Sequence, residues 1–262
     1  MPTHSPLQNC LLAALPPEVQ ERLFPLLELT RLPLGKVLYE SGDTLRHVYF
    51  PTDSIVSLLY TMQNGASGEI SVVGNEGVVG VSLFMGGEST SSRALVQSAG
   101  SAYRLTGDRM KDEFRRHGEM LEVLLRYTQS LITQMTQTAA CNRHHSIDEQ
   151  MARWLLLSLD RLTGNKMKMT QQLIANMLSV SCARVTEVAS KLQKLGVIRY
   201  QSGLIQVLNR RTLEKLSCEC YAVVRGETDR LLDCAPFTLR GKGRSRRARR
   251  AASRHTRRLA RA

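Results

Sequence analysis

The stretch from residue 169 to residue 208 constrains the fold most, because its hydrophobic pattern changes in a fixed order. Apolar residues follow a capping threonine, Thr170, at helical spacing as far as Leu178. A polar break over 179–181 precedes a second helical pattern that runs to Leu192. Gly196 is a typical helix end, and two short apolar strands then flank a turn at 201–203. The stretch predicts a helix-turn-helix followed by a two-stranded wing.

The second predicted helix has a polar face that suits the major groove of DNA. The first residues of such a helix reach base edges, and its later residues contact phosphates. Within this face, Glu187 suits cytosine N4, and Arg184 suits guanine or phosphate. The alternative is an ordinary helix pair beside a β-hairpin. The predicted DNA interface comprises Thr170, Gln171, Ser181, Cys182, Ala183, Arg184, Glu187, Lys191 and Lys194.

This stretch resembles the C-terminal winged helix-turn-helix of the Crp/Fnr family of bacterial transcription regulators. Upstream, GKVLYESGD (35–43) and VYFP (48–51) resemble the family's cyclic-nucleotide-binding-like sensor domain. The resemblance spans roughly residues 10–235 and implies a homodimer whose partners are double-stranded DNA and RNA polymerase. Ser179 stands where the family usually has glycine, and Cys182-Ala183 replaces the usual arginine and glutamate. We therefore expect a DNA site that differs from the family's best-known sites.

Residues 30–105 show short strands separated by glycine-containing turns, which is typical of a β-roll or jelly roll. One of these candidate strands covers 31–39. The expected fold class is α+β, with an N-terminal β-roll or jelly-roll sensor domain, a long dimerisation helix and a C-terminal winged helix-turn-helix. The expected boundaries are 1–107 for the sensor domain, 108–145 for the long helix and its hinge at 141–145, 146–235 for the DNA-binding domain and 236–262 for a disordered Arg-rich tail.

Residues 108–142 form a long helical pattern with two apolar stripes. The first is a heptad-like seam made of Leu121, Leu125, Thr128, Ile132 and Met135. The second consists of Leu124, Tyr127, Leu131 and Gln134. A helix needs two stripes if it packs on the roll and also on a second copy of the chain. The alternative is one wide core-facing surface.

The resemblance places the effector pocket at Glu76, Gly77, Val78, Val79, Gly80, Ser92, Arg93 and Ala94. Nucleotide-binding members carry Gly-Glu-aliphatic-small and then Arg-Ser/Thr-Ala, where the glutamate binds ribose and the arginine binds the cyclic phosphate. Here Val78 and Ser92 stand at those two positions, and Glu76 and Arg93 are out of register. Arg93 should also point away from the pocket, because neighbouring side chains of a strand face opposite ways. These departures argue against cyclic nucleotide binding in the usual manner, and the effector stays open.

The six cysteines are scattered, and only Cys218 and Cys220 form a close pair. A C-x-C pair needs two further ligands to hold a metal ion. The histidines, including His144 and His145, show no ligand spacing. Iron–sulfur members of the family carry a cysteine cluster near the N-terminus, where this chain has only Cys10. We therefore expect no metal ion and no iron–sulfur cluster.

The net charge of +13 lies mostly in the tail, because residues 240–262 contain eleven Lys or Arg and no acidic residue. Such a tail binds phosphates without reading sequence, and salt weakens that binding steeply. A second hypothesis is therefore a non-specific, architectural nucleic-acid-binding protein driven by the basic tail. Deleting residues 240–262 separates the hypotheses, because sequence-specific binding survives only under the first.

Other classes of protein find no support in the sequence. Nucleophile-elbow, zinc-protease, Walker and dinucleotide-binding motifs are absent, so we expect no enzyme. The longest apolar runs fall short of the roughly 18 residues that span a bilayer, and the N-terminus lacks the basic start of a signal peptide. We expect a cytoplasmic protein without a membrane partner.

Overall fold

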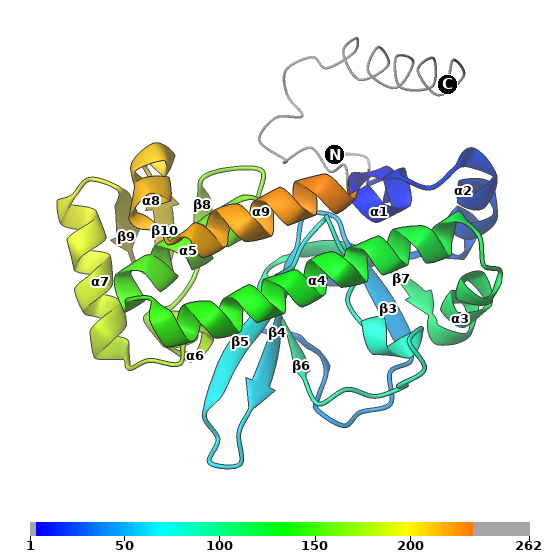
Figure 1. Cartoon of the computed structure of the whole chain (residues 1–262), viewed down its shortest axis with the longest axis horizontal. Helices are drawn as coiled ribbons and strands as arrows, with labels where there is room; N and C mark the ends of the chain where they lie inside the picture. The colour runs from blue at the N-terminus through cyan, green and yellow to red at the C-terminus, as the bar shows by residue number, and fades with distance from the viewer. Residues whose placement is uncertain (1–3, 233–262) are drawn as a thin grey trace, which may run out of the picture.

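The computed structural model describes residues 4–232, so the Arg-rich tail (236–262) lies outside the described residues. The N-terminal half is a roll of two antiparallel sheets (Figure 1). One sheet has the order β1 (Glu28–Leu32), β7 (Gly100–Thr106) and β3 (His47–Pro51). The other has the order β2 (Val37–Tyr39), β6 (Arg93–Ser98), β4 (Ile55–Thr61) and β5 (Ser67–Val73). Apolar residues of both sheets, among them Phe50, Val56 and Ala94, form the core of the roll.

Short helices close the roll. Before β1 lie η1 (Pro6–Gln8), α1 (Cys10–Ala13), α2 (Pro17–Leu23) and η2 (Phe24–Leu26), and η3 (Val81–Leu83) follows β5. The expectation of one strand over 31–39 is wrong, because β1 and β2 belong to different sheets. Pro33 has no N–H for a strand ladder, and Gly35 turns the chain with a φ of +79°.

The helical pattern expected over 108–142 is two helices, α3 (Gly107–Arg115) and α4 (Glu119–His144). The break falls at His117, whose φ is +54°. The hinge is shorter than the expected 141–145, because α4 continues to His144 and α5 (Ile147–Leu159) begins after Ser146. A capping box fixes this start: the Ser146 N–H donates to Glu149 Oε2 over 2.8 Å, and the Glu149 N–H donates to Ser146 Oγ.

The C-terminal half is a winged helix-turn-helix, as expected. After α5 come β8 (Lys166–Lys168), α6 (Gln171–Leu178), α7 (Cys182–Lys194), β9 (Ile198–Gln201), β10 (Leu204–Val207), α8 (Arg210–Leu216) and α9 (Glu219–Leu232). The wing has a third strand that the sequence pattern did not reveal, since β8 pairs with β10. Only Met167 of β8 is buried, and one apolar residue between two lysines is too short a pattern to detect.

The two halves pack directly on each other. Ile55, Leu59 and Val72, on the outer face of the four-stranded sheet, share a hydrophobic core with α5, α6 and α7. Helix α9 then runs back beside α4 toward the roll (Figure 1), where Leu232 joins the roll core. Within residues 4–232, the helices lack the combination of length and hydropathy that crossing a bilayer requires.

Candidate nucleic-acid interface and effector region

Hydroxyl side chains set the geometry of the helix-turn-helix. Thr170 Oγ1 accepts from the Leu173 N–H over 3.2 Å and caps α6, and Ser181 Oγ accepts from the Arg184 N–H and caps α7. Between them, Ser179 adopts the left-handed conformation with φ +55° and ψ +41°. Such a conformation costs a non-glycine residue about 1–2 kcal/mol. Ser179 Oγ offsets part of this strain by donating to the Ser67 carbonyl oxygen of β5 over 3.1 Å.

Helix α7 buries one face and exposes the other. Val185, Val188, Ala189 and Leu192 pack into the C-terminal core, as the sequence pattern predicts. Of the nine predicted interface residues, seven belong to α7 or its cap, and Thr170 and Gln171 belong to the start of α6. Eight of the nine are exposed, and Cys182 is half-buried. Cys182 Sγ donates to Gln172 Oε1 over 3.1 Å, which ties the start of α7 to α6.

The charged residues of this surface form a chain of ion pairs. Glu187 accepts from Arg184 over 2.5 Å and from Lys191 over 3.3 Å. Lys191 also reaches Asp148 of α5 over 3.3 Å. Hydrogen bonding to Lys191, followed by the charge of Arg184, lowers the pKa of the Glu187 carboxyl. The Glu187 side chain is therefore a carboxylate at neutral pH and acts only as a hydrogen-bond acceptor.

The wing adds basic residues that sequence reasoning did not include. Lys168 and Arg199 are exposed and line a surface groove with Thr170 and Ser202. The tip of the hairpin has a φ of +51° at Ser202 and +72° at Gly203, as a tight two-residue turn requires. The sequence signal for this basic strand was a lysine on either side of Met167. That pattern indicates a strand of the wing only together with the pairing of β8 with β10.

The two stripes of α4 face different surroundings. Tyr127, Leu131 and the rest of the second stripe are buried against the roll, and the Gln134 side chain exchanges two hydrogen bonds with the Val72 backbone of β5. Of the seam, Leu125 and Ile132 are 54% and 51% exposed. Leu121 and Met135 are half-buried, whereas Thr128 is buried and its hydroxyl donates to the Leu124 carbonyl oxygen.

The loop 74–80 joins three parts of the molecule. Val78 and Val79 are fully buried in the roll core, and Gly80 has a φ of +100°. Gly77 lies so close to α4 that a Cβ there would stand 2.5 Å from the Tyr127 ring. Its carbonyl oxygen accepts from Asn9 Nδ2 over 2.9 Å. The loop is thus fixed to the N-terminal segment and to the long helix.

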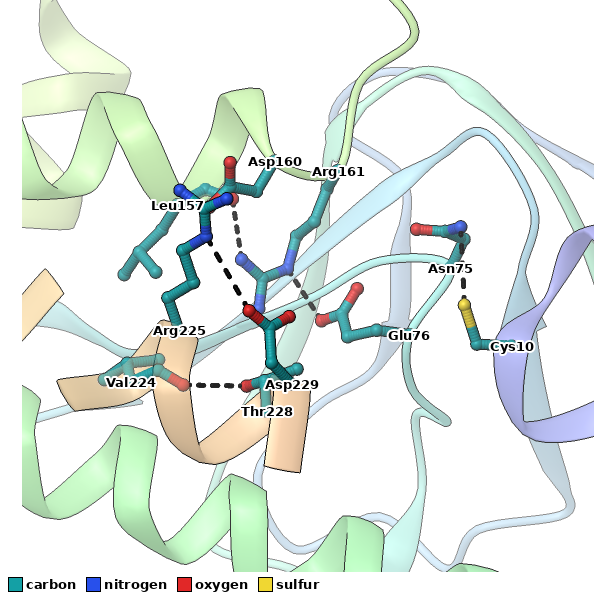
Figure 2. A pocket seen from close by; sticks show the side chains of 10 residues that line it. All are labelled: Cys10, Asn75, Glu76, Leu157, Asp160, Arg161, Val224, Arg225, Thr228 and Asp229. Atoms are coloured by element: carbon teal, nitrogen blue, oxygen red, sulfur yellow. Dashed lines mark hydrogen bonds and ion pairs between the residues drawn. The ribbon is translucent and has the colours of Figure 1, made fainter. Parts of the chain in front are cut away.

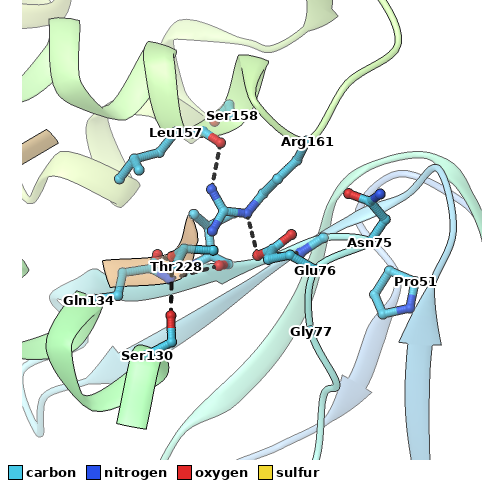
Figure 3. A network of polar contacts seen from close by, with 12 residues as sticks. Pro51, Asn75, Glu76, Gly77, Ser130, Gln134, Leu157, Ser158, Arg161 and Thr228 are labelled. Carbon is cyan, nitrogen blue, oxygen red and sulfur yellow. Dashed lines mark hydrogen bonds and ion pairs between the residues drawn. The ribbon is translucent and has the colours of Figure 1, made fainter. Parts of the chain in front are cut away.

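Glu76 connects the same loop to the DNA-binding half. Arg161, just after α5, donates through Nε to Glu76 Oε1 over 2.7 Å, and both side chains are largely buried. Arg161 also donates to the Leu157 carbonyl oxygen over 2.6 Å. Figures 2 and 3 show this ion pair where the loop, the end of α5 and helix α9 meet around a small cavity. Glu76 therefore points toward α5 and away from the interior of the roll.

The second predicted effector segment divides between the two faces of β6. Ala94 and Val96 face the roll core, so Arg93 lies on the other face, as the alternation of the strand predicts. There Arg93 pairs with Glu40 over 3.2 Å. Ser92 is buried and shares a hydrogen bond with Thr90 over 3.0 Å. The structure thus brings Val78, Val79 and Ala94 together in the core and separates Glu76 and Arg93 from them.

A cysteine and histidine cluster was missed at the sequence level. Cys141 and His145, at the end of α4, meet Cys218 and Cys220, at the start of α9. The three cysteines carry free thiols and are buried. Burial raises the pKa of the Cys141 thiol to about 12. Two sequence motifs could have indicated this cluster. One is C-x₃-H, which places two side chains on one face of a helix end, and the other is C-x-C.

Comparisons with known proteins agree with this architecture. The family model for the cyclic nucleotide-binding domain matches residues 29–117, and the Crp-like helix-turn-helix domain model matches residues 149–216. The two models together match more than half of the chain. Among curated proteins, none is significantly similar in sequence to this chain.

Solved structures of transcription regulators share the fold at low sequence identity. A Eubacterium rectale protein assigned to the Crp/Fnr family is 14% identical, with a TM-score of 0.62 over 79% of this chain and 96% of its own. FixK2 from Bradyrhizobium japonicum is 15% identical, with a TM-score of 0.61 over 73% and 98%. The c-di-GMP-responsive global regulator CLP of Xanthomonas campestris is 15% identical, with a TM-score of 0.58 over 72% and 97%.

The order of the matched domains, the long helix between them and the winged helix-turn-helix are those of regulators, not enzymes. The chain therefore belongs to the Crp/Fnr family of transcriptional regulators.

Proposed function

We propose that this protein is a homodimeric regulator that binds a specific DNA sequence through α7. The exposed polar face of α7, backed by a fully apolar buried face, carries this proposal. A helix of this kind fits the major groove, and a hairpin wing reaches the neighbouring phosphates. The basic side chains at Lys168 and Arg199 supply the charge that a wing needs for that contact.

The residues of the interface divide into two roles. Ser181 caps α7, and Cys182, Ala183, Arg184 and Glu187 lie in its first two turns, where side chains reach base edges. The small Ala183 leaves room for close approach, and the Glu187 carboxylate suits the N4 donor of cytosine. Thr170, Gln171, Lys191 and Lys194 lie at the edges of this face and contact the phosphate backbone. Lys191 exchanges its exposed ion pairs for a phosphate at little cost.

The dimer forms through the seam of α4. Leu125 and Ile132 stand seven residues apart and are exposed, so they lie one above the other along one face of the helix. Burying two such side chains per chain removes apolar surface from water, and a long helix supports the side-by-side pairing. A second copy packed along this seam presents two copies of α7 to successive major grooves, about one helical turn apart.

The effector region lies at the loop 74–80 together with residues 92–94. The loop touches both the long helix, through Tyr127, and the DNA-binding half, through Arg161. A ligand that shifts this loop alters both contacts, and it changes the position of α7 in the dimer. Because Glu76 and Arg93 face away from the roll interior, the ligand is held by other groups than those that bind cyclic nucleotides elsewhere in the family.

Selection of bound fragments from random DNA tests the proposal. The full-length protein is used at moderate salt, with and without cyclic AMP, beside a variant that ends at residue 239. We expect both chains to enrich the same near-palindromic site, with a smaller salt dependence for the shortened chain. Unchanged enrichment with cyclic AMP is expected. The proposal is contradicted if the shortened chain no longer binds DNA, or if neither chain enriches any sequence. Either result supports an architectural protein.

A further inference from the structure

Four potential metal ligands converge where α4 ends and α9 begins. Cys141 lies in the last turn of α4, and His145 follows four residues later as its C-cap. Side chains at this spacing lie on one face of a helix. Cys218 and Cys220 flank Glu219, the first residue of α9. Cys141 and Cys218 are 77 residues apart in the chain, so only the packing of α9 beside α4 brings the two pairs together.

The distances suit a single tetrahedral ion. The four ligand atoms, three Sγ and one imidazole nitrogen, all lie within 4.8 Å of one another. Cys141 Sγ is 3.5 Å from Cys218 Sγ, and Cys220 Sγ is 3.6 Å from His145 Nδ1. Sulfurs bound to zinc at roughly 2.3 Å in a tetrahedron are about 3.8 Å apart. The side chains therefore already stand close to the positions that a bound zinc ion requires.

The groups around the four ligands fit the same assignment. The imidazole presents Nδ1 to Cys220, and its Nε2 lies 3.3 Å from the Glu219 carboxylate. A carboxylate on the second nitrogen fixes the tautomer in which the first nitrogen is free to bind a metal.

We propose that Cys141, His145, Cys218 and Cys220 bind one zinc ion. Binding forms three Zn–S bonds and one Zn–N bond, and it releases the three thiol protons to solvent. The resulting site carries one negative charge, because three thiolates and a neutral imidazole surround a doubly charged ion. The buried guanidinium of Arg153, which interacts electrostatically with Cys141, balances that charge. A closed set of four protein ligands indicates a structural site, since catalytic zinc keeps a position open.

The ion connects the dimer helix to the DNA-binding half. The proposed function requires a fixed position of one relative to the other. The ligands of the ion come from the end of the dimer helix and from the last helix of the DNA-binding half. Residues 146–217, which contain α5, the helix-turn-helix and the wing, lie between the two ligand pairs, so the ion fastens both ends of this segment to the end of α4. This consequence for DNA binding rests on the proposed function, whereas metal binding itself does not.

The test uses the full-length protein, purified under reducing conditions and dialysed against metal-free buffer. Elemental analysis is expected to find one zinc per chain. Replacement by Co²⁺ is expected to produce the visible bands of tetrahedral cobalt and the near-ultraviolet absorption of thiolate-to-cobalt charge transfer. Both measurements read the metal and not DNA binding, so their outcome is independent of the proposed function.

Three variants sharpen the test. Cys218→Ser removes a ligand and is expected to lose the metal, whereas Cys182→Ser, an exchange of a cysteine outside the cluster, is expected to keep one zinc per chain. Glu219→Gln keeps all four ligands and changes only an exposed side chain, so its folding should be unaffected. It is expected to lower zinc affinity about 10- to 100-fold, as loss of an orienting partner does.

Several results overturn the inference. Wild-type protein that binds neither Zn²⁺ nor Co²⁺ contradicts it, as does equal metal loss in Cys182→Ser and Cys218→Ser. A disulfide between Cys141 and Cys218 in the reduced preparation also contradicts it. Iron with acid-labile sulfide in place of zinc would show that the site holds a cluster and not a single ion.

Discussion

Glu69 offers a quantitative test of how the two halves pack. This β5 residue is buried beneath α5, where Oε1 accepts from Trp154 Nε1 over 2.9 Å. Burial raises the pKa of the Glu69 carboxyl from 4.5 to about 7, although hydrogen bonding by Ser57 and the charge of Arg153 oppose the rise. The folded protein therefore binds a proton at Glu69 in a pH range where the unfolded chain does not.

The sign of the pH dependence follows from this raised pKa. The stability that protonated Glu69 contributes is complete below pH 4.5 and is lost as pH rises through about 7. The difference between the pKa of Glu69 in the unfolded chain and in the folded protein corresponds to roughly 3 kcal/mol of stability, at about 1.4 kcal/mol for each pKa unit. The glutamine of Glu69→Gln cannot ionise, so its contribution does not change with pH. The free energy of unfolding of this variant, relative to wild type, should therefore rise by about 3 kcal/mol from about pH 4 to about pH 8.

Urea unfolding at several pH values measures this gain. The fluorescence of Trp154, the only tryptophan of the chain, reports the contact directly. Glu18→Gln, which makes the same exchange at an exposed side chain, is the matched control. If the difference between Glu69→Gln and wild type stays constant across this pH range, the carboxyl is not buried against α5 as described.

Three further predictions concern the ion pair at Glu76, the turn at Ser179 and the seam of α4. Arg161→Met should destabilise the protein by about 3–5 kcal/mol in urea unfolding, because it leaves the Glu76 carboxylate buried without its partner; adding Glu76→Leu should recover part of this loss, and no recovery would contradict the pairing. Ser179→Ala should cost about 1 kcal/mol by removing the bond to β5 while keeping the backbone strain, whereas Ser179→Gly, which relieves that strain, should stay closer to wild type in thermal unfolding; equal losses would refute this account. Leu125→Asp with Ile132→Asp should give a folded monomer in analytical ultracentrifugation, and a persistent dimer would exclude the α4 seam.

Local signals in the sequence were sufficient for much of the fold and for the local structure of the helix-turn-helix. The caps at Thr170 and Ser181 and the apolar spacing of α7 each depend on residues a few positions apart. The turn at Ser202-Gly203 is equally local. Such features are encoded by helix periodicity and backbone preference, so they can be read from one sequence.

Contacts between distant segments could not be read in this way. Arg161 meets Glu76 across 85 residues, and Trp154 meets Glu69 across the same separation. The Cys/His cluster depends on the return of α9 along α4, which periodicity does not predict. For the same reason, Glu76 looked like a displaced effector ligand, whereas it is the partner of an arginine in the other half.

The most direct test of the account is a change of DNA specificity at one residue of α7. Random DNA is selected with wild type and with Glu187→Gln, which replaces a carboxylate acceptor by an amide that suits adenine. We predict a near-palindromic site for both proteins, with a changed base preference confined to one symmetric position in each half-site. A variant that selects the same sequence, or that loses affinity equally for all sequences, would contradict base recognition by α7.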